Sequence, residues 1–221
     1  CAGVMWSEAC LPWEWGAPAG SSPLPRWSVG WNRRSEEEMV VETEPAFHYV
    51  CTRGEAWTLV EGEDRFWVSN CGCRESRGNC GRSRMDLCLL FQGDAGASGS
   101  GLHEVSRAEV EAIFREAREK HLVSRPFRSE DRSRVDGICF CCDDCCGYFT
   151  GPEENPACGR GPSIERTDQV LCANCGTCVE VCHFQARRLA GYELKVDRGR
   201  CYGCGLCTEA CEQGAIGMAP R

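Results

Sequence analysis

The chain has 221 residues, enough for one or two domains, and a formal net charge of −8. That charge lies entirely in residues 1–162, because acidic and basic residues balance from 163 onward. An acidic surface repels nucleic acid and is attracted to basic protein faces, so the composition argues against nucleic-acid binding. The sequence has no apolar run of the roughly 18 residues that a transmembrane segment needs.

Cysteine makes up 21 of the 221 residues. Such a content is typical of short secreted scaffolds held by disulfides, but this chain is neither short nor arranged in that way. Reduced thiols that hold metals suit a reducing compartment better than an oxidising one. We therefore expect a cytoplasmic protein.

Residues 1–45 have an irregular composition, with several prolines and glycines and an acidic run at 36–38. Five of the seven tryptophans of the chain lie here: Trp6, Trp13, Trp15, Trp27 and Trp31. Tryptophan is a preferred interface anchor, so one hypothesis is that this segment docks on a partner subunit. The alternative is that these side chains pack on the chain's own domain, which we expect for Trp57 and Trp67.

Residues 46–162 are predicted to form a cysteine-rich module with a small sheet and one helix. Phe47–Cys51 is a candidate strand, and 56–60 with 65–68 reads as a hairpin around a polar turn. A Gly/Ser linker, 93–101, precedes the helix. Ser106 and Glu109 form a capping box at its start, and one apolar face continues to about His121.

Two groups of cysteines flank this helix, one in the stretch 71–88 and one in the stretch 139–146. Several free thiols so close together would be reactive, so metal ligation is the economical explanation. We predict that the helix brings the groups together as a hairpin, to bind one or two additional iron–sulfur clusters or zinc. The candidate ligands are Cys71, Cys73, Cys80, Cys88, Cys139, Cys141, Cys142, Cys145 and Cys146.

The last sixty residues contain the same cysteine pattern twice, C-x2-C-x2-C-x3-C, at an offset of 29 residues. The first run is Cys172, Cys175, Cys178 and Cys182, and the second is Cys201, Cys204, Cys207 and Cys211. This repetition indicates an internal duplication. A structural zinc site needs only two cysteine pairs, and disulfides need no triplet spacing, so the pattern favours iron–sulfur binding over both.

On these motifs, residues 163–221 resemble the bacterial-type ferredoxins that carry two 4Fe-4S clusters. The resemblance implies that the fourth cysteine of each run serves the other cluster. One cluster would use Cys172, Cys175, Cys178 and Cys211, and the other Cys201, Cys204, Cys207 and Cys182. The sequence departs from that family after the fourth cysteines, where proline is usual, because it has His183 and Glu212.

The stretch 66–221 as a whole resembles a loosely characterised group of larger bacterial and archaeal 4Fe-4S binding proteins, in which such a module ends a cysteine-rich chain. We therefore predict an α+β protein in three parts, 1–45, 46–162 and 163–221. Cysteine-ligated clusters have no open site for a substrate. The expected function is accordingly electron transfer within a larger oxidoreductase complex, through redox partner proteins, rather than catalysis.

Two alternatives remain open from the sequence. Cys145-Cys146-Gly147 is similar to the CCG motif of heterodisulfide-reductase-type catalytic subunits, although a second CCG is missing. The other alternative is a redox or metal sensor, in which a zinc-binding front module gains or loses its metal.

Overall fold

The computed structural model describes residues 45–93, 99–150 and 158–221. The predicted docking segment with its five tryptophans lies outside these ranges, except for its last residue. None of the helices in the described ranges combines the length and the apolar character that crossing a bilayer requires.

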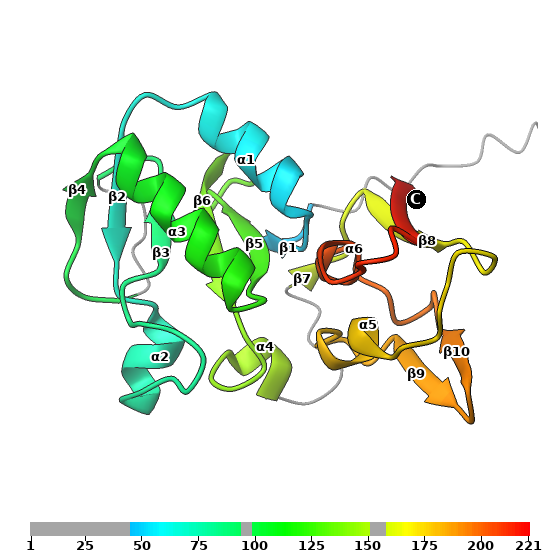
Figure 1. The fold of residues 1–221 in the computed structure, drawn as a ribbon. Helices are drawn as coiled ribbons and strands as arrows, with labels where there is room; N and C mark the ends of the chain where they lie inside the picture. The colour runs from blue at the N-terminus through cyan, green and yellow to red at the C-terminus, as the bar shows by residue number, and fades with distance from the viewer. Residues whose placement is uncertain (1–44, 94–98, 151–157) are drawn as a thin grey trace, which may run out of the picture. The chain divides into compact units, whose positions relative to one another are not determined.

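A seven-stranded sheet forms the scaffold of residues 46–162, which we call the front module (Figure 1). Its strand order is β4-β2-β3-β6-β5-β1-β7. Only β1 and β7 pair in parallel among these neighbours. The strands are β1 His48–Tyr49, β2 Phe66–Ser69, β3 Cys88–Leu90, β4 His103–Val105, β5 Val123–Arg128, β6 Val135–Cys141 and β7 Cys158–Gly159.

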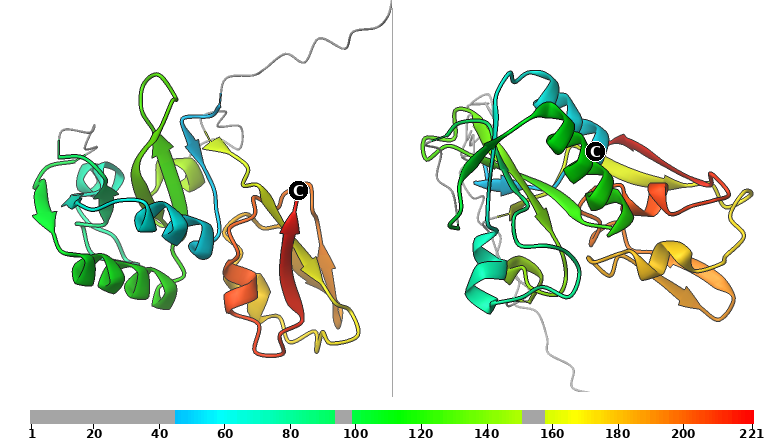
Figure 2. Two further views of the ribbon diagram at one scale, coloured as in Figure 1. Left: turned by 90° about the horizontal axis from the view of Figure 1, so that it is seen from above. Right: turned by 60° about the vertical axis from the view of Figure 1, so that its left-hand side comes forward.

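Helices α1 (Arg53–Glu61) and α3 (Arg107–Glu119) lie side by side on one face of this sheet (Figures 1 and 2). The predicted helix is confirmed as α3, with the Ser106–Glu109 capping box at its start. Its apolar face is buried against the sheet, as the 3.6-residue period requires. The buried residues of that face are Val110, Ile113, Phe114 and Ala117.

The prediction of a strand at 56–60 is wrong, because this stretch belongs to helix α1. A second capping box, Thr52 with Glu55, starts the helix and overrides the β-favouring residues that follow. Only Ala56 and Val60 of the helix are buried, at a spacing of four that suits a helix and not a half-buried strand. The second half of the supposed hairpin is indeed a strand, β2, and Phe47–Cys51 contains β1.

Both tryptophans of the described front module pack on it. Trp57 meets Phe114 edge to face, with ring centroids 5.0 Å apart, and Trp67 packs beside buried residues of β3. The mixture of helices and strands agrees with the predicted α+β class. The sheet has seven strands, however, and is larger than the small one expected, and α3 is not the one helix of this module.

Two short helices, α2 (Gly72–Arg77) and α4 (Gly147–Thr150), lie near the same end of the sheet (Figures 1 and 2). The nine candidate cysteines of the front module lie on or near these helices and on β3 and β6.

Residues 163–221, which we call the C-terminal module, consist of two short pairs of antiparallel strands and two single-turn helices. Strand β8 (Ser163–Thr167) pairs with β11 (Ile216–Pro220), and β9 (Arg187–Ala190) pairs with β10 (Glu193–Val196). Helices α5 (Thr177–Glu180) and α6 (Leu206–Glu209) follow the two cysteine triplets. One cluster of buried residues inside this module contains only Cys178, Leu194, Cys207 and Ile216. Half of that small core is therefore cysteine.

Candidate metal centres

The two cysteine triplets lie on loops with the same backbone geometry. Asn174 and Gly176 in the first loop have positive φ angles of 54° and 86°, and Gly203 and Gly205 at the equivalent positions of the second have 84° and 77°. A side chain at Gly203 would come within 2.1 Å of the Ser163 carbonyl oxygen, so only glycine fits there. The duplication seen in the sequence is thus also a duplication of loop shape.

The first hollow of the C-terminal module is lined by Cys172, Cys175, Cys178 and Cys211. Leu194 and Ile216 also line it with apolar side chains. Three of its cysteines come from the first run and one from the second.

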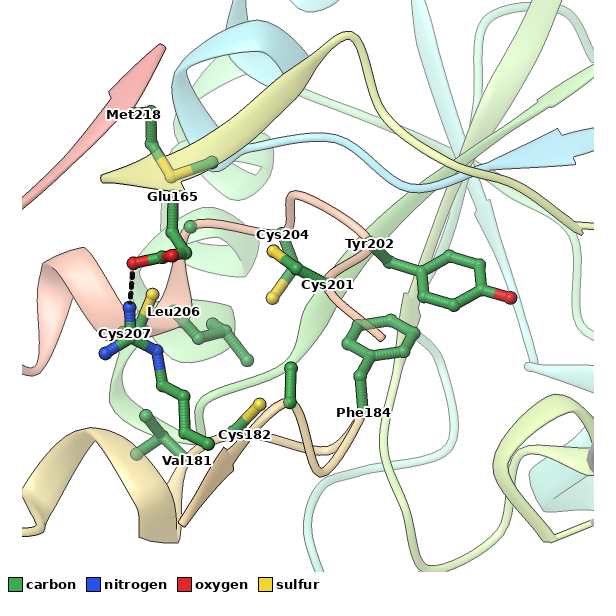
Figure 3. A pocket seen from close by; sticks show the side chains of 13 residues that line it. Glu165, Val181, Cys182, Phe184, Cys201, Tyr202, Cys204, Leu206, Cys207 and Met218 are labelled. Carbon is green, nitrogen blue, oxygen red and sulfur yellow. Dashed lines mark hydrogen bonds and ion pairs between the residues drawn. The ribbon is translucent and has the colours of Figure 1, made fainter. Parts of the chain in front are cut away.

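The second hollow is lined by Cys182, Cys201, Cys204 and Cys207, again three cysteines from one run and one from the other. Figure 3 shows these four side chains gathered around the space, with Phe184 and Tyr202 on one side.

Burial in the second hollow disfavours the ionised, thiolate form of its cysteines. It raises the pKa of Cys207 to about 11, and it also raises the pKa of Cys204 and of Cys182. At neutral pH these groups would stay protonated unless a positive charge replaced their protons. A metal ion supplies that charge, since thiolates are the form that binds metals. The donor set therefore fits a metal cluster.

A buried ion pair lies against the cysteine sulfurs of this module. Arg187 is 4 % exposed and Glu165 is 1 % exposed. The Arg187 Nη2 atom donates to Glu165 Oε2 at 2.6 Å, while its Nη1 donates to the Cys178 sulfur at 3.3 Å. Arg198 also contacts Glu165, at 3.1 Å. The guanidinium thus places a fixed positive charge beside a candidate cluster ligand.

His183, which replaces the proline usual in the resembled family, joins the C-terminal module to the front module. Its Nε2 lies 2.8 Å from the carbonyl oxygen of His121, and its Nδ1 lies 3.3 Å from Asp143 Oδ2. The side chain is only 4 % exposed. A bidentate contact of Arg53 with Glu209, at 2.9 and 3.1 Å, joins the modules at a second place.

In the front module, Cys80, Cys142 and Cys145 form a compact group that we call the thiol triangle. Their sulfurs are 3.6 Å (Cys80 to Cys142), 3.4 Å (Cys142 to Cys145) and 3.5 Å (Cys145 to Cys80) apart. Within the described ranges, no other three Cys, His, Asp or Glu side chains bring their ligand atoms within 4.8 Å of one another.

The remaining front cysteines are arranged as a row of neighbouring sulfurs rather than a compact group. Hydrogen bonds with Cys146 and Cys71 lower the pKa of Cys73 below the ordinary cysteine value. Cys139 lies opposite Cys88 in the β3–β6 register. Hydrogen bonds join successive sulfurs along this row in the order Cys71, Cys73, Cys146, Cys141, Cys139 and Cys88.

Arg125 lies against this row. Its side chain is 6 % exposed, and it donates to the sulfurs of Cys158 at 3.3 Å, Cys146 at 3.3 Å and Cys141 at 3.5 Å. The Arg125 guanidinium also stacks 4.5 Å from the ring of Tyr148. An open groove about 750 Å³ in volume borders the row.

The structure thus brings all nine predicted front cysteines to one end of the sheet, although not in the predicted way. Strand pairing of β3 with β6 joins the two groups, and the α3 helix does not act as a hairpin between them. The nine residues divide between the triangle and the row. The sequence did not predict that Arg74, Arg125 and Cys158 would lie beside these cysteines. Only Arg74 could have been suspected, because it directly follows the Cys71-Gly-Cys73 motif.

A family model described as a 4Fe-4S dicluster domain matches residues 171–216. The match covers both C-terminal cysteine runs, and less than a quarter of the chain. This stretch is therefore similar to proteins that bind two 4Fe-4S clusters, and iron–sulfur electron transfer is the chemistry that the domain suggests. A search of curated proteins finds no match to this chain.

Proposed function

We propose that this chain carries single electrons through two 4Fe-4S clusters held by residues 163–221, as an electron-transfer subunit of a larger redox complex. The observation that carries the proposal is the division of the eight C-terminal cysteines between two hollows. Each hollow takes three cysteines from one run and the fourth from the other.

This division supports the ligand sets that the family resemblance implied. The first set is Cys172, Cys175, Cys178 and Cys211, and the second is Cys201, Cys204, Cys207 and Cys182. Clusters of this type supply one-electron chemistry over a wide range of potentials. The chain's own residues would hold the ligands in place, exclude water with apolar side chains, and set the local charge through Arg187.

Complete cysteine ligation supports a carrier rather than a catalyst, since no coordination position is left for a substrate. The excess negative charge of residues 1–162 favours a partner with a basic docking face. The cysteines of the front module would add one or two further metal sites.

Cysteine substitutions in a background that keeps a single cluster test the crossed ligand sets. A variant that lacks Cys172 and Cys175 should keep only the cluster of the second hollow. Adding Cys182→Ala should then abolish the electron paramagnetic resonance signal of that reduced cluster. Adding Cys211→Ala should leave it unchanged. Cys51→Ala is the matched control, because Cys51 is buried but lines neither hollow.

The opposite pattern, with the signal lost on Cys211→Ala and kept on Cys182→Ala, would mean that each run holds its own cluster. Protein purified without oxygen that contains no acid-labile sulfide in its C-terminal module would refute the proposed function itself.

A further inference from the structure

We propose that the thiol triangle of Cys80, Cys142 and Cys145 binds one zinc ion, as a site separate from the iron–sulfur clusters. The three sulfurs are 3.4–3.6 Å apart. A tetrahedral zinc ion with bonds of about 2.3 Å to sulfur holds its ligand sulfurs about 3.8 Å apart. One ion just off the plane of the three sulfurs therefore needs only a slight opening of the group.

The same spacing argues against a 4Fe-4S cluster at this place. Each cysteine of such a cluster binds a different iron, so the ligand sulfurs lie around the outside of the cube and farther apart. The cysteines of the two C-terminal hollows behave in this way, since no three of them lie within 4.8 Å of one another. The triangle is a different kind of site.

Contacts that do not involve sulfur hold the triangle together. Cys142 and Cys145 follow strand β6, and Cys80 lies on the loop after α2. The Gly81 backbone N–H donates to Asp144 Oδ2 at 2.8 Å, and Arg82 forms a fork with Asp143 at 2.9 and 3.0 Å. The two loops are thus positioned by their own hydrogen bonds, which preorganises the ligands.

The charge of the neighbouring Arg74 matches a zinc ion with three thiolates. Arg74 is fully buried, and it donates from Nη2 to the Phe140 carbonyl oxygen at 3.0 Å. Within the described part of the chain no carboxylate forms an ion pair with it. A buried cation requires a compensating anion. Zinc with three thiolates carries a charge of −1, so the site and Arg74 together are neutral.

The fourth ligand of the zinc ion is none of the cysteines that the structure describes. No other thiol, imidazole or carboxylate in the described ranges joins the three sulfurs. The nearby Asp143 is engaged by Arg82, and Asp144 by Gly81. Cys80 is half-buried, and Cys145 lines the open groove that borders the row. A water molecule or small ligand can reach the metal from this side. Three protein ligands with one open position distinguish this site from a closed structural zinc site, which has four protein ligands.

Metal analysis and zinc K-edge X-ray absorption on the full chain, purified without oxygen, test the proposal. We expect about one zinc per chain beside the iron, with three sulfurs at about 2.3 Å and one lighter ligand atom. Cys142→Ser should remove the zinc and leave the iron content unchanged. Cys80→Ser, on a surface loop, should do the same if Cys142→Ser fails to fold. Cys139→Ser is the matched control, since Cys139 belongs to the row, and it should keep the zinc.

A chain whose Cys142→Ser variant loses iron and no zinc would refute the site, as would a disulfide between Cys142 and Cys145 in the native protein. Four sulfurs around the zinc would refute the open position. None of these results depends on the clusters of the C-terminal module, so this proposal and the electron-transfer proposal fail separately.

Discussion

Three buried arginines lie beside cysteine sulfurs in this protein: Arg74, Arg125 and Arg187. Arg187 donates to Cys178 and Arg125 to three sulfurs of the row, while Arg74 lies next to the thiol triangle. Burial disfavours a guanidinium charge, yet the neighbouring sulfurs raise the pKa of all three above the ordinary arginine value. Positive charge is therefore fixed at each candidate centre.

Arg187→Met tests the role of one of these charges. Removing a positive charge next to a ligand sulfur disfavours the added electron, so the potential of the nearest cluster should fall. At roughly 6 Å and an effective dielectric constant of about 20 the shift is on the order of 100 mV. Protein-film voltammetry measures it. Arg188→Met is the matched control, because Arg188 is the next residue of β9 and is exposed. Equal shifts in both variants would show that surface charge, and not the contact with Cys178, sets the potential.

At the scale of elements, the capping boxes decide where the two long helices begin. In α3 the Ser106 side chain accepts from the Glu109 backbone N–H, while the Glu109 side chain accepts from the Ser106 backbone N–H. The helix covers the sheet with four buried side chains, so its start also fixes how the core is covered.

Ser106→Ala should lower the free energy of unfolding of the front module by about 1 kcal/mol, because the cap acceptor is lost. Urea unfolding followed by circular dichroism, with the clusters kept intact, measures the change. Ser106→Asp restores a capping acceptor and should recover most of the stability. An unchanged urea midpoint in Ser106→Ala would show that the capping box does not determine where α3 begins.

The same elements show which features a sequence can predict. Helix α3 was predictable because thirteen residues repeat one apolar period after a clear cap. Helix α1 was mistaken for a strand, since its nine residues bury only two side chains and are rich in β-favouring types. Local spacing likewise selected the eight C-terminal cysteines and the nine of the front module as candidate ligands, which stays a prediction.

The partners of those cysteines could not be predicted. Arg125 meets Cys158 across 33 positions of sequence, and Arg74 reaches Phe140 across 66. No local pattern records such contacts, because strand order in the sheet creates them. The separation of the triangle from the row has the same origin. Adjacent residues such as Cys145 and Cys146 point to different groups, and spacing alone does not reveal which sulfur meets which.

At the scale of the whole molecule, the two modules differ in how they are stabilised. The sheet and helices α1 and α3 share an extensive apolar core, whereas one core cluster of the C-terminal module has four residues, two of them cysteine. We therefore expect the C-terminal module to depend on metal for its folded state.

Removal of iron with a chelator under reducing conditions should unfold this module selectively. Hydrogen exchange read by mass spectrometry should show residues 163–221 losing protection, while β5 and β6 keep theirs. Reconstitution with iron and sulfide should restore the protection. Simultaneous loss across both modules would mean that the front sheet has no independent stability.

The contacts of His183 also link the two candidate metal regions through one buried side chain. Its Nε2 faces the His121 carbonyl, and its Nδ1 faces the Asp143 carboxylate. His183 directly follows Cys182, which lines the second hollow, and Asp143 directly follows Cys142 of the thiol triangle. One side chain thus ties the loop of a candidate cluster ligand to the loop that carries two sulfurs of the triangle.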